Sequence, residues 1–278
     1  MNTRINTIFF FLFSVSMGWS QSLIVELDEK LAESSALIVI NDSSFITLND
    51  SGNTPELYVF NIEGEVTHTC YIANSKNKDW EALAYDGENR LFIGDIGDNK
   101  NKRKKRTIYT VFLDEVLTED TTIASVMSFT YQEQTAFPPP KEALYYDAEA
   151  LVFKNDSLFV FTKNRTVPFD GIVKVYALNL IDSIQEAAVF FELELPATSW
   201  IEDSVTDAFY DDGTLLLLTY SKIYHFNWEN NKPKYLDKKL MENVTQKEGV
   251  FLYNGTIFLT DEASPFGTQS LYSMPFWK

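Results

Sequence analysis

The chain has 278 residues, of which 45% are hydrophobic and 15% aromatic, enough apolar material for one large domain. Its formal net charge of −17 at pH 7 disfavours nucleic acids and anionic membrane surfaces as partners, because both would repel it. The lone Cys70 cannot form an internal disulfide, so core burial must hold the fold together. Its place in a strand-like run, residues 66–72, predicts a small buried side chain.

The first twenty residues are predicted to be a secretory signal peptide, outside the fold. Arg4 gives a positive start, residues 8–17 form an apolar run, and Gly18-Trp19-Ser20 places small residues at the cleavage positions. We therefore expect a mature chain, 21–278, that is exported to the periplasm or the extracellular space. No later stretch approaches the roughly 20 apolar residues of a spanning helix, so no membrane insertion is expected.

A three-residue motif, called the phrase below, recurs along the mature chain: an acidic residue, a small residue and an apolar residue. It begins four strand-like units, and a neutral version begins the first of the five: Ser35-Ala36-Leu37, Glu81-Ala82-Leu83, Glu149-Ala150-Leu151, Asp207-Ala208-Phe209 and Glu248-Gly249-Val250. A near-continuous apolar run follows each phrase, typical of a strand buried on both faces: 45–48, 91–93, 158–161, 215–218 and 257–259. A third strand with an apolar-Tyr pair comes next: Leu57-Tyr58, Ile108-Tyr109, Val175-Tyr176, Ile223-Tyr224 and Leu271-Tyr272.

Four units continue into a fourth, outer strand, at 66–72, 124–131, 187–195 and 234–240. The fifth unit has none, whereas the mature N-terminus supplies a spare strand at 22–29. The pattern predicts an all-β, five-bladed β-propeller with four strands per blade, whose last blade is closed by the N-terminal strand. We expect residues 21–278 to form a single domain and a monomer. The basic run at 100–106 is interpreted as a solvated hairpin loop, in preference to an anion-binding one.

In a propeller blade the first strand starts on the face where the second strand ends. This places the acidic residues of four phrases around one mouth of the central channel: Glu81, Glu149, Asp207 and Glu248. The ends of the second strands add further residues to the same rim: Asn49-Asp50-Ser51, residues 95–99 with Asp95, Lys163-Asn164-Arg165, Tyr220 and Asp261-Glu262. Asp79 and Asp147, two residues before their glutamates, also lie on it. Two unit charges at ~4 Å repel by about 4 kcal/mol at an effective dielectric of 20. Raised pKa values, a cation, or Lys163 and Arg165 must relieve that repulsion.

Calcium is the expected cation, because it takes six to eight oxygen ligands in flexible geometry. Its candidate ligands are Glu81, Glu149, Asp207 and Glu248, with Asp95 as a weaker one. His68 and His225 lie within strands, which argues against both a zinc site and a Ser-His-Asp triad. The alternative is structural: each carboxylate accepts hydrogen bonds from the backbone of the neighbouring blade and so locks the ring.

An ordered set of motifs resembles an uncharacterised family of exported bacterial propeller proteins over nearly all of the mature chain. The motifs are Asn49-Asp50-Ser51-Gly52, Asp79-Trp80-Glu81-Ala82-Leu83, Gly94-Asp95-Ile96-Gly97-Asp98-Asn99, Asp147-Ala148-Glu149-Ala150-Leu151, Phe161-Thr162-Lys163-Asn164-Arg165-Thr166 and Thr260-Asp261-Glu262. That family is distantly similar to calcium-containing propellers of the phytase-like and lactonase-like kind, an analogy of fold. Ser35 and Val205 depart from the acidic pattern of the other units.

Three functions remain open. The first is a calcium-dependent hydrolase of a phosphoester or other ester, in which Lys163 and Arg165 hold an anionic group. The second is a non-catalytic ligand-binding or scaffolding propeller, and the third is a glycosidase that uses two mouth carboxylates ~5–5.5 Å or ~6.5–9.5 Å apart. The ligand would be a small molecule or a glycan. Trp80, Trp200 and Tyr220 are candidates to stack on a sugar, although a core position is the favoured interpretation in a chain that is 15% aromatic.

Overall fold

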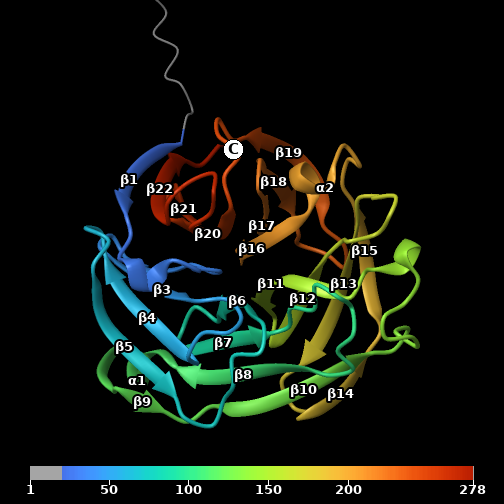
Figure 1. The fold of residues 1–278 in the computed structure, drawn as a ribbon, viewed down its shortest axis with the longest axis horizontal. Helices are drawn as coiled ribbons and strands as arrows, with labels where there is room; N and C mark the ends of the chain where they lie inside the picture. Colours follow the sequence, from blue (N-terminus) through green and yellow to red (C-terminus); the bar gives the residue numbers. More distant parts are fainter. Residues whose placement is uncertain (1–20, 278) are drawn as a thin grey trace, which may run out of the picture.

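Five sheets, each built on four antiparallel strands, surround a central channel as the blades of a β-propeller in the computed structural model (Figure 1). This confirms the predicted fold class. The structure describes residues 21–277, so the predicted leader at 1–20 lies outside the described residues. Within 21–277 no helix has both the length and the apolar character needed to cross a membrane.

Blades one to four are each formed by successive strands of the chain. Blade one contains β2 (Ile38–Asn41), β3 (Ser44–Leu48), β4 (Glu56–Asn61) and β5 (Val66–Ile72). Blade two contains β6 (Trp80–Tyr85), β7 (Arg90–Asp95), β8 (Arg106–Phe112) and β10 (Ser125–Tyr131). Blade three contains β11 (Asp147–Lys154), β12 (Ser157–Lys163), β13 (Ile172–Asn179) and β15 (Val189–Glu194). Blade four contains β16 (Val205–Asp211), β17 (Thr214–Thr219), β18 (Lys222–Asn227) and β19 (Lys234–Leu240).

The fifth blade closes the ring by joining distant parts of the chain. Its strands are β20 (Lys247–Tyr253), β21 (Thr256–Asp261), β22 (Ser270–Pro275) and, on the outside, β1 (Ser22–Glu26). β1 pairs antiparallel with β22, which confirms the predicted closure. β1 ends three residues before the predicted boundary at 29, because Asp28 caps the 3-10 helix η1 (Glu29–Leu31).

Two short strands cross from one blade to the outer edge of the blade before it. β9 (Thr121–Thr122) pairs in parallel with β5, and β14 (Ile184–Ala187) pairs in parallel with β10. The predicted outer strand at 187–195 is therefore wrong at its start, since Ala187 belongs to the sheet of blade two. The crossings satisfy backbone groups that an edge strand would otherwise expose.

Five apolar clusters hold the ring, one between each pair of neighbouring blades. The second strands supply much of them, and Leu215 to Leu218 of β17 are all fully buried. Cys70 is also fully buried, as predicted. The remaining short helices are α1 (Leu113–Thr118), η2 (Lys141–Ala143) and α2 (Trp200–Asp203).

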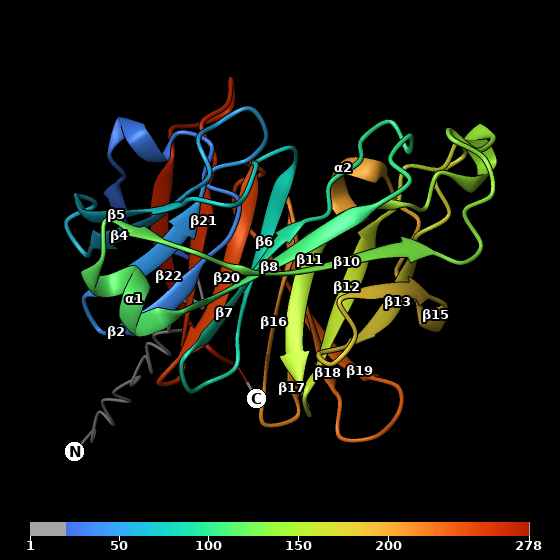
Figure 2. The same cartoon turned by 90° about the horizontal axis from the view of Figure 1, so that it is seen from below.

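The inner strands β2, β6, β11, β16 and β20 all run the same way along the channel. In Figure 2, β11 starts on the upper side, where α2 lies, and points to the lower side. The end of the channel where these strands start is called the acidic mouth below, and the end toward which they point is called the far end.

Candidate site at the acidic mouth

The acidic residues of three phrases lie at β-bulges. The pairing of β6 with β7 skips Glu81, that of β11 with β12 skips Glu149, and that of β20 with β21 skips Glu248. In blade four the skipped residue is Thr206, and Asp207 instead pairs with Leu218. Because a bulge turns a side chain out of the regular alternation, Asp207 is presented differently from the three glutamates.

Asp207 contacts the next blade rather than the other predicted residues. It is buried, and its Oδ2 accepts a hydrogen bond of 2.8 Å from the backbone N–H of Val250 in blade five. Burial raises the pKa of this carboxyl well above its ordinary value. The ring-locking role therefore fits Asp207.

Glu81 lies instead in a group of three carboxylates between blades one and two. Asp50, Asp79 and Glu81 each offer an oxygen, and these atoms all lie within 4.8 Å of one another. Glu81 is buried, whereas Asp50 and Asp79 are half-buried. Ser35, the neutral residue of the first phrase, donates a hydrogen bond of 3.1 Å from its Oγ to Glu81 Oε2.

Gly97 forms a wall of this group. A Cβ at position 97 would lie 2.5 Å from Glu81 Oε1 and 2.7 Å from Asp79 Oδ2. Only glycine permits the backbone to approach the carboxylates so closely. This explains the glycine in the loop that follows β7.

The three carboxylates carry strongly perturbed pKa values. Burial, followed by the charges of Asp50 and Asp147, raises the pKa of Asp79 to about 7. Burial and then the charges of Glu149 and Asp50 raise the pKa of Glu81 well above its ordinary value. Burial also raises the pKa of Asp50. Within residues 21–277 none of the three forms an ion pair, so the fold leaves this group without a bonded counter-charge.

The oxygen atoms of this group suit a hard divalent cation. Calcium binds carboxylate oxygens in flexible geometry and completes its shell with water, which the half-buried Asp50 and Asp79 would admit. Asp50 and Asp79 are thus better placed than the predicted ligands Glu149, Asp207 and Glu248. The sequence places both on this rim, but it does not show that the end of β3 meets the start of β6 and so brings Asp50 to Asp79 and Glu81.

A second group surrounds Lys163, which is only 3% exposed. Its Nζ lies 3.2 Å from Glu149 Oε2 and donates a hydrogen bond of 2.8 Å to the hydroxyl of Tyr220. Arg165 Nη2 lies 3.6 Å from Glu149 Oε1, and Arg165 Nε pairs with Asp147. The structure therefore brings Glu149, Lys163, Arg165 and Tyr220 together.

Glu248 belongs to the same group through its charge. Although burial alone would lower the pKa of Lys163, Glu149 and Glu248 raise it well above its ordinary value. Burial raises the pKa of Glu149 to about 8 against the opposing charge of Lys163, and raises that of Glu248 as well. Lys163 therefore stays protonated, and the raised pKa values favour the neutral form of each glutamate more than in water. Glu248 Oε2 has no hydrogen-bond partner among the described residues.

Two half-buried aromatic side chains border these cations. The rings of Trp200, on α2, and Tyr220 lie 5.9 Å apart. Lys163 Nζ lies 5.0 Å from the centre of the Tyr220 ring, and Arg165 Cζ lies 5.3 Å from that of Trp200. Trp80, in contrast, is fully buried in the core between blades one and two and is unavailable to a sugar.

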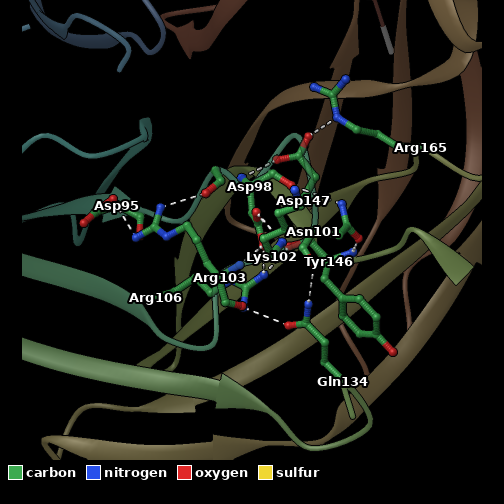
Figure 3. Close-up of polar contacts among 11 residues, drawn as sticks. Asp95, Asp98, Asn101, Lys102, Arg103, Arg106, Gln134, Tyr146, Asp147 and Arg165 are labelled. Atoms are coloured by element: carbon green, nitrogen blue, oxygen red, sulfur yellow. Dashed lines mark hydrogen bonds and ion pairs between the residues drawn. The ribbon is translucent and has the colours of Figure 1, made fainter. Parts of the chain in front are cut away.

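The weaker metal candidate, Asp95, has a counter-charge within the fold (Figure 3). Its Oδ1 accepts hydrogen bonds from Arg103 Nη2 at 2.8 Å and from the backbone N–H of Asp79 at 3.1 Å. Asp98 accepts hydrogen bonds of 2.8 Å from Arg106 Nη2 and from the backbone N–H groups of Lys102 and Arg103. Both aspartates are thus neutralised by arginines of the loop 100–106.

The expectation of a solvated loop at 100–106 is wrong for its two arginines. Arg106 is fully buried, donates hydrogen bonds of 2.8 Å to Gln134 Oε1 and to the carbonyl of Tyr146, and lies 4.6 Å from the centre of the Tyr131 ring. The lysines at 100, 102, 104 and 105 are exposed as expected. Arg103 is half-buried and bonds to Asp95 and Gly97 within blade two, whereas Arg106 compensates Asp98 and joins blade two to blade three.

No protein-family model and no curated protein matches the sequence. Similarity to solved structures extends over most of the chain. The glutaminyl cyclase of Myxococcus xanthus is 11% identical, with 93% of this chain and 98% of that chain covered and a TM-score of 0.53. A luciferin-regenerating enzyme is 11% identical, with 88% and 80% covered and a TM-score of 0.49. At this identity the likeness to the cyclase supports the propeller fold alone.

Proposed function

We propose that this protein is an exported, metal-dependent propeller hydrolase whose cation is held by Asp50, Asp79 and Glu81. The observation that carries this proposal is the group of three carboxylates with oxygens within 4.8 Å of one another and no ion pair within residues 21–277. Calcium is the cation we propose, since its ligands are oxygen atoms and it is plentiful outside cells. Bound there, it would relieve the repulsion that contributes to the raised pKa of Asp79 and Glu81.

The substrate we propose is a phosphoester or another ester with an anionic group. A bound cation supplies a water of lowered pKa as the nucleophile. Arg165, with 21% of its side chain exposed, would bind the anionic group, and Glu149 and Asp147 hold its guanidinium in place. Lys163, which pairs with the same Glu149, adds positive charge, and Trp200 and Tyr220 border the proposed position of the substrate. Glu248, with one unpaired oxygen, is positioned to hold a proton near the same place.

Calcium titration of the purified protein tests the metal site. We expect calcium to raise the melting temperature and EDTA to reverse the rise, and we expect Asp79→Asn and Glu81→Gln to abolish it. Asp207→Asn is the matched control, since it removes a buried mouth carboxylate that bonds to blade five instead. The proposal fails if no divalent cation shifts the melting temperature, or if the control loses the shift as completely as the other two variants.

Turnover of p-nitrophenyl phosphate and p-nitrophenyl acetate, with calcium and with EDTA, tests the reaction. Calcium-dependent hydrolysis that falls in Arg165→Met supports the hydrolase. Calcium binding with no turnover across a wider ester panel would instead leave a ligand-binding propeller.

Glu149 and Glu248 favour a glycosidase as the second candidate. Both have raised pKa values, and the charges of both raise the pKa of Lys163. The half-buried Trp200 and Tyr220 border the same group. Glycoside hydrolysis requires two carboxyl groups, one acting as the acid and one as the base, and these two glutamates would supply them. Hydrolysis of 4-methylumbelliferyl glycosides that persists in EDTA and is lost in both Glu149→Gln and Glu248→Gln would establish it.

A further inference from the structure

A cavity of about 570 Å³ lies in the channel toward the far end. It is lined by the later parts of the five inner strands and the turns that follow, residues 37–40, 83–87, 151–155, 208–211 and 250–254. None of Asp79, Glu81, Glu149 or Glu248 lines it, because they stand where the same strands begin. Its volume is within the range of about 300–1,000 Å³ that is usual for small-molecule sites.

Half-buried aromatic side chains from four successive blades line this cavity. Tyr85, Phe153, Tyr210, Phe251 and Tyr253 come from the inner strands of blades two, three, four and five, and the half-buried Ile40 comes from blade one. A planar aromatic group entering the cavity would meet ring faces or edges on several sides.

Lys154 is the single basic residue of the lining. Its Nζ donates a hydrogen bond of 2.9 Å to the hydroxyl of Tyr210 and lies 4.8 Å from the centre of the Tyr210 ring. Among the described residues it forms no ion pair. It also lies 5.5 Å from the centre of the Trp228 ring, and because an ammonium has three donors it can donate to a ligand as well as to Tyr210.

The acidic residues of the lining leave that charge uncompensated. Asp86 is paired with Arg90 at 2.6 Å, and its Oδ1 accepts backbone hydrogen bonds from residues 88–90. Asp211 is exposed at the turn after β16. The cavity thus combines aromatic walls with one half-buried cation that has no acidic partner within residues 21–277.

We propose that the far end of the channel is a second ligand site, which binds a small aromatic carboxylate. The aromatic ring of the ligand lies among Tyr85, Phe153, Tyr210 and Tyr253, and its carboxylate accepts a hydrogen bond from Lys154. The site is separate from the acidic mouth and does not depend on the hydrolase proposed above.

Three naphthalene probes of one shape test this site: 2-naphthoate, 2-naphthylmethanol and 2-naphthylmethylamine, which is cationic at pH 7.5. Calorimetric titration of the mature chain in EDTA is expected to show 2-naphthoate binding about tenfold more tightly than the alcohol, as one charge-assisted hydrogen bond would provide. Lys154→Met is expected to remove that difference and Lys154→Arg to retain it. Melting curves check that each variant is folded.

The rival anion site is the acidic mouth, where Arg165→Met is the control and should leave naphthoate binding unchanged. The proposal is overturned if Arg165→Met removes the binding, or if Lys154→Met folds and binds naphthoate as wild type does. Equal affinity for acid and alcohol in the wild type, tighter binding of the amine, or no binding of naphthoate overturns it without any variant.

Discussion

Two groups of carboxylates lie on the same side of the ring, and the fold treats them differently. Asp95 and Asp98, in and after β7, each receive a hydrogen bond from an arginine of the loop that follows, Arg103 or Arg106. Asp50, Asp79 and Glu81 receive none from an arginine or lysine within residues 21–277. In this ring, acidic residues that lack a bonded arginine or lysine are therefore the candidates for binding a cation, whereas those paired with an arginine are not.

The largest expected effect is on the compensated group. Arg106→Met would leave Asp98 buried without its guanidinium partner and would leave Gln134 and the Tyr146 carbonyl short of a donor. Loss of one partner of a buried ion pair costs about 3–5 kcal/mol. Urea denaturation measures the change, and Arg90→Met, which breaks a partly exposed pair, is the control at about 0–1 kcal/mol. A loss below that of Arg90→Met would show that the two groups do not differ as described.

The uncompensated group should respond in the opposite way. In EDTA at pH 7.5, Glu81→Gln is expected to keep or raise the melting temperature, because glutamine mimics the neutral carboxyl that the raised pKa of Glu81 favours and cannot become a charge repelled by its neighbours. Each kcal/mol gained raises the melting temperature by about 2–4 °C in a chain of this size. The same variant should weaken calcium binding about tenfold or more, or at least about 1.4 kcal/mol, by calorimetry. A lower melting temperature in EDTA would mean that Glu81 stabilises the folded protein without a cation.

The pH dependence of stability sharpens the comparison further. The pKa of Asp79 is about 7 in the folded protein, above its ordinary value of 3.8, so the folded state binds this proton more tightly than the unfolded chain does. Its contribution is therefore greatest below about pH 4 and is lost as the pH rises to about 7.

Melting curves in EDTA between these pH values should show that decline, and Asp79→Asn should reduce it. Saturating calcium should oppose the decline, because the cation binds the deprotonated form. A decline of the same size in wild type and variant would assign it to other groups.

The smallest effect is expected at Asp207. Its raised pKa favours the neutral carboxyl, and asparagine keeps an oxygen that can accept the N–H of Val250. Asp207→Asn should therefore change the free energy of unfolding by less than about 1 kcal/mol, the scale of one neutral hydrogen bond. A loss as large as that of Arg106→Met would show that Asp207 acts as a charge.

The propeller itself was predictable, because its signals are local and repeated. The phrases and the apolar second strands recur five times along the chain. The spare N-terminal strand matches the missing fourth strand of the last unit. β14 was not predictable, since Ile184–Ala187 pairs with blade two although it follows the third strand of blade three. Nothing within those four residues indicates that their pairing partner is β10 of blade two.

The site was predictable as a face of the ring but not as a set of contacts. Glu149 and Lys163 were expected on one rim, and they form a pair at 3.2 Å. Asp50 lies beside Glu81 because blades one and two meet there. Asp207 contacts blade five instead, since the bulge of its strand falls one residue earlier, at Thr206. A shift of one residue at a bulge is decided by packing between blades, which the spacing of the phrases does not encode.

The closure of the ring by β1 makes the completion of the fold a late event in the life of the chain. The hydrogen bond from Gln269 to the carbonyl of Leu27 spans 242 residues. At a synthesis rate of about 5–20 residues per second, β1 waits roughly 12–50 s before its partner β22 exists. Pairing over so long a separation is also slow in itself. The apolar residues of β1 that closure covers, Ile24 and Val25, are therefore the surface that a chaperone would have to protect in the newly made chain.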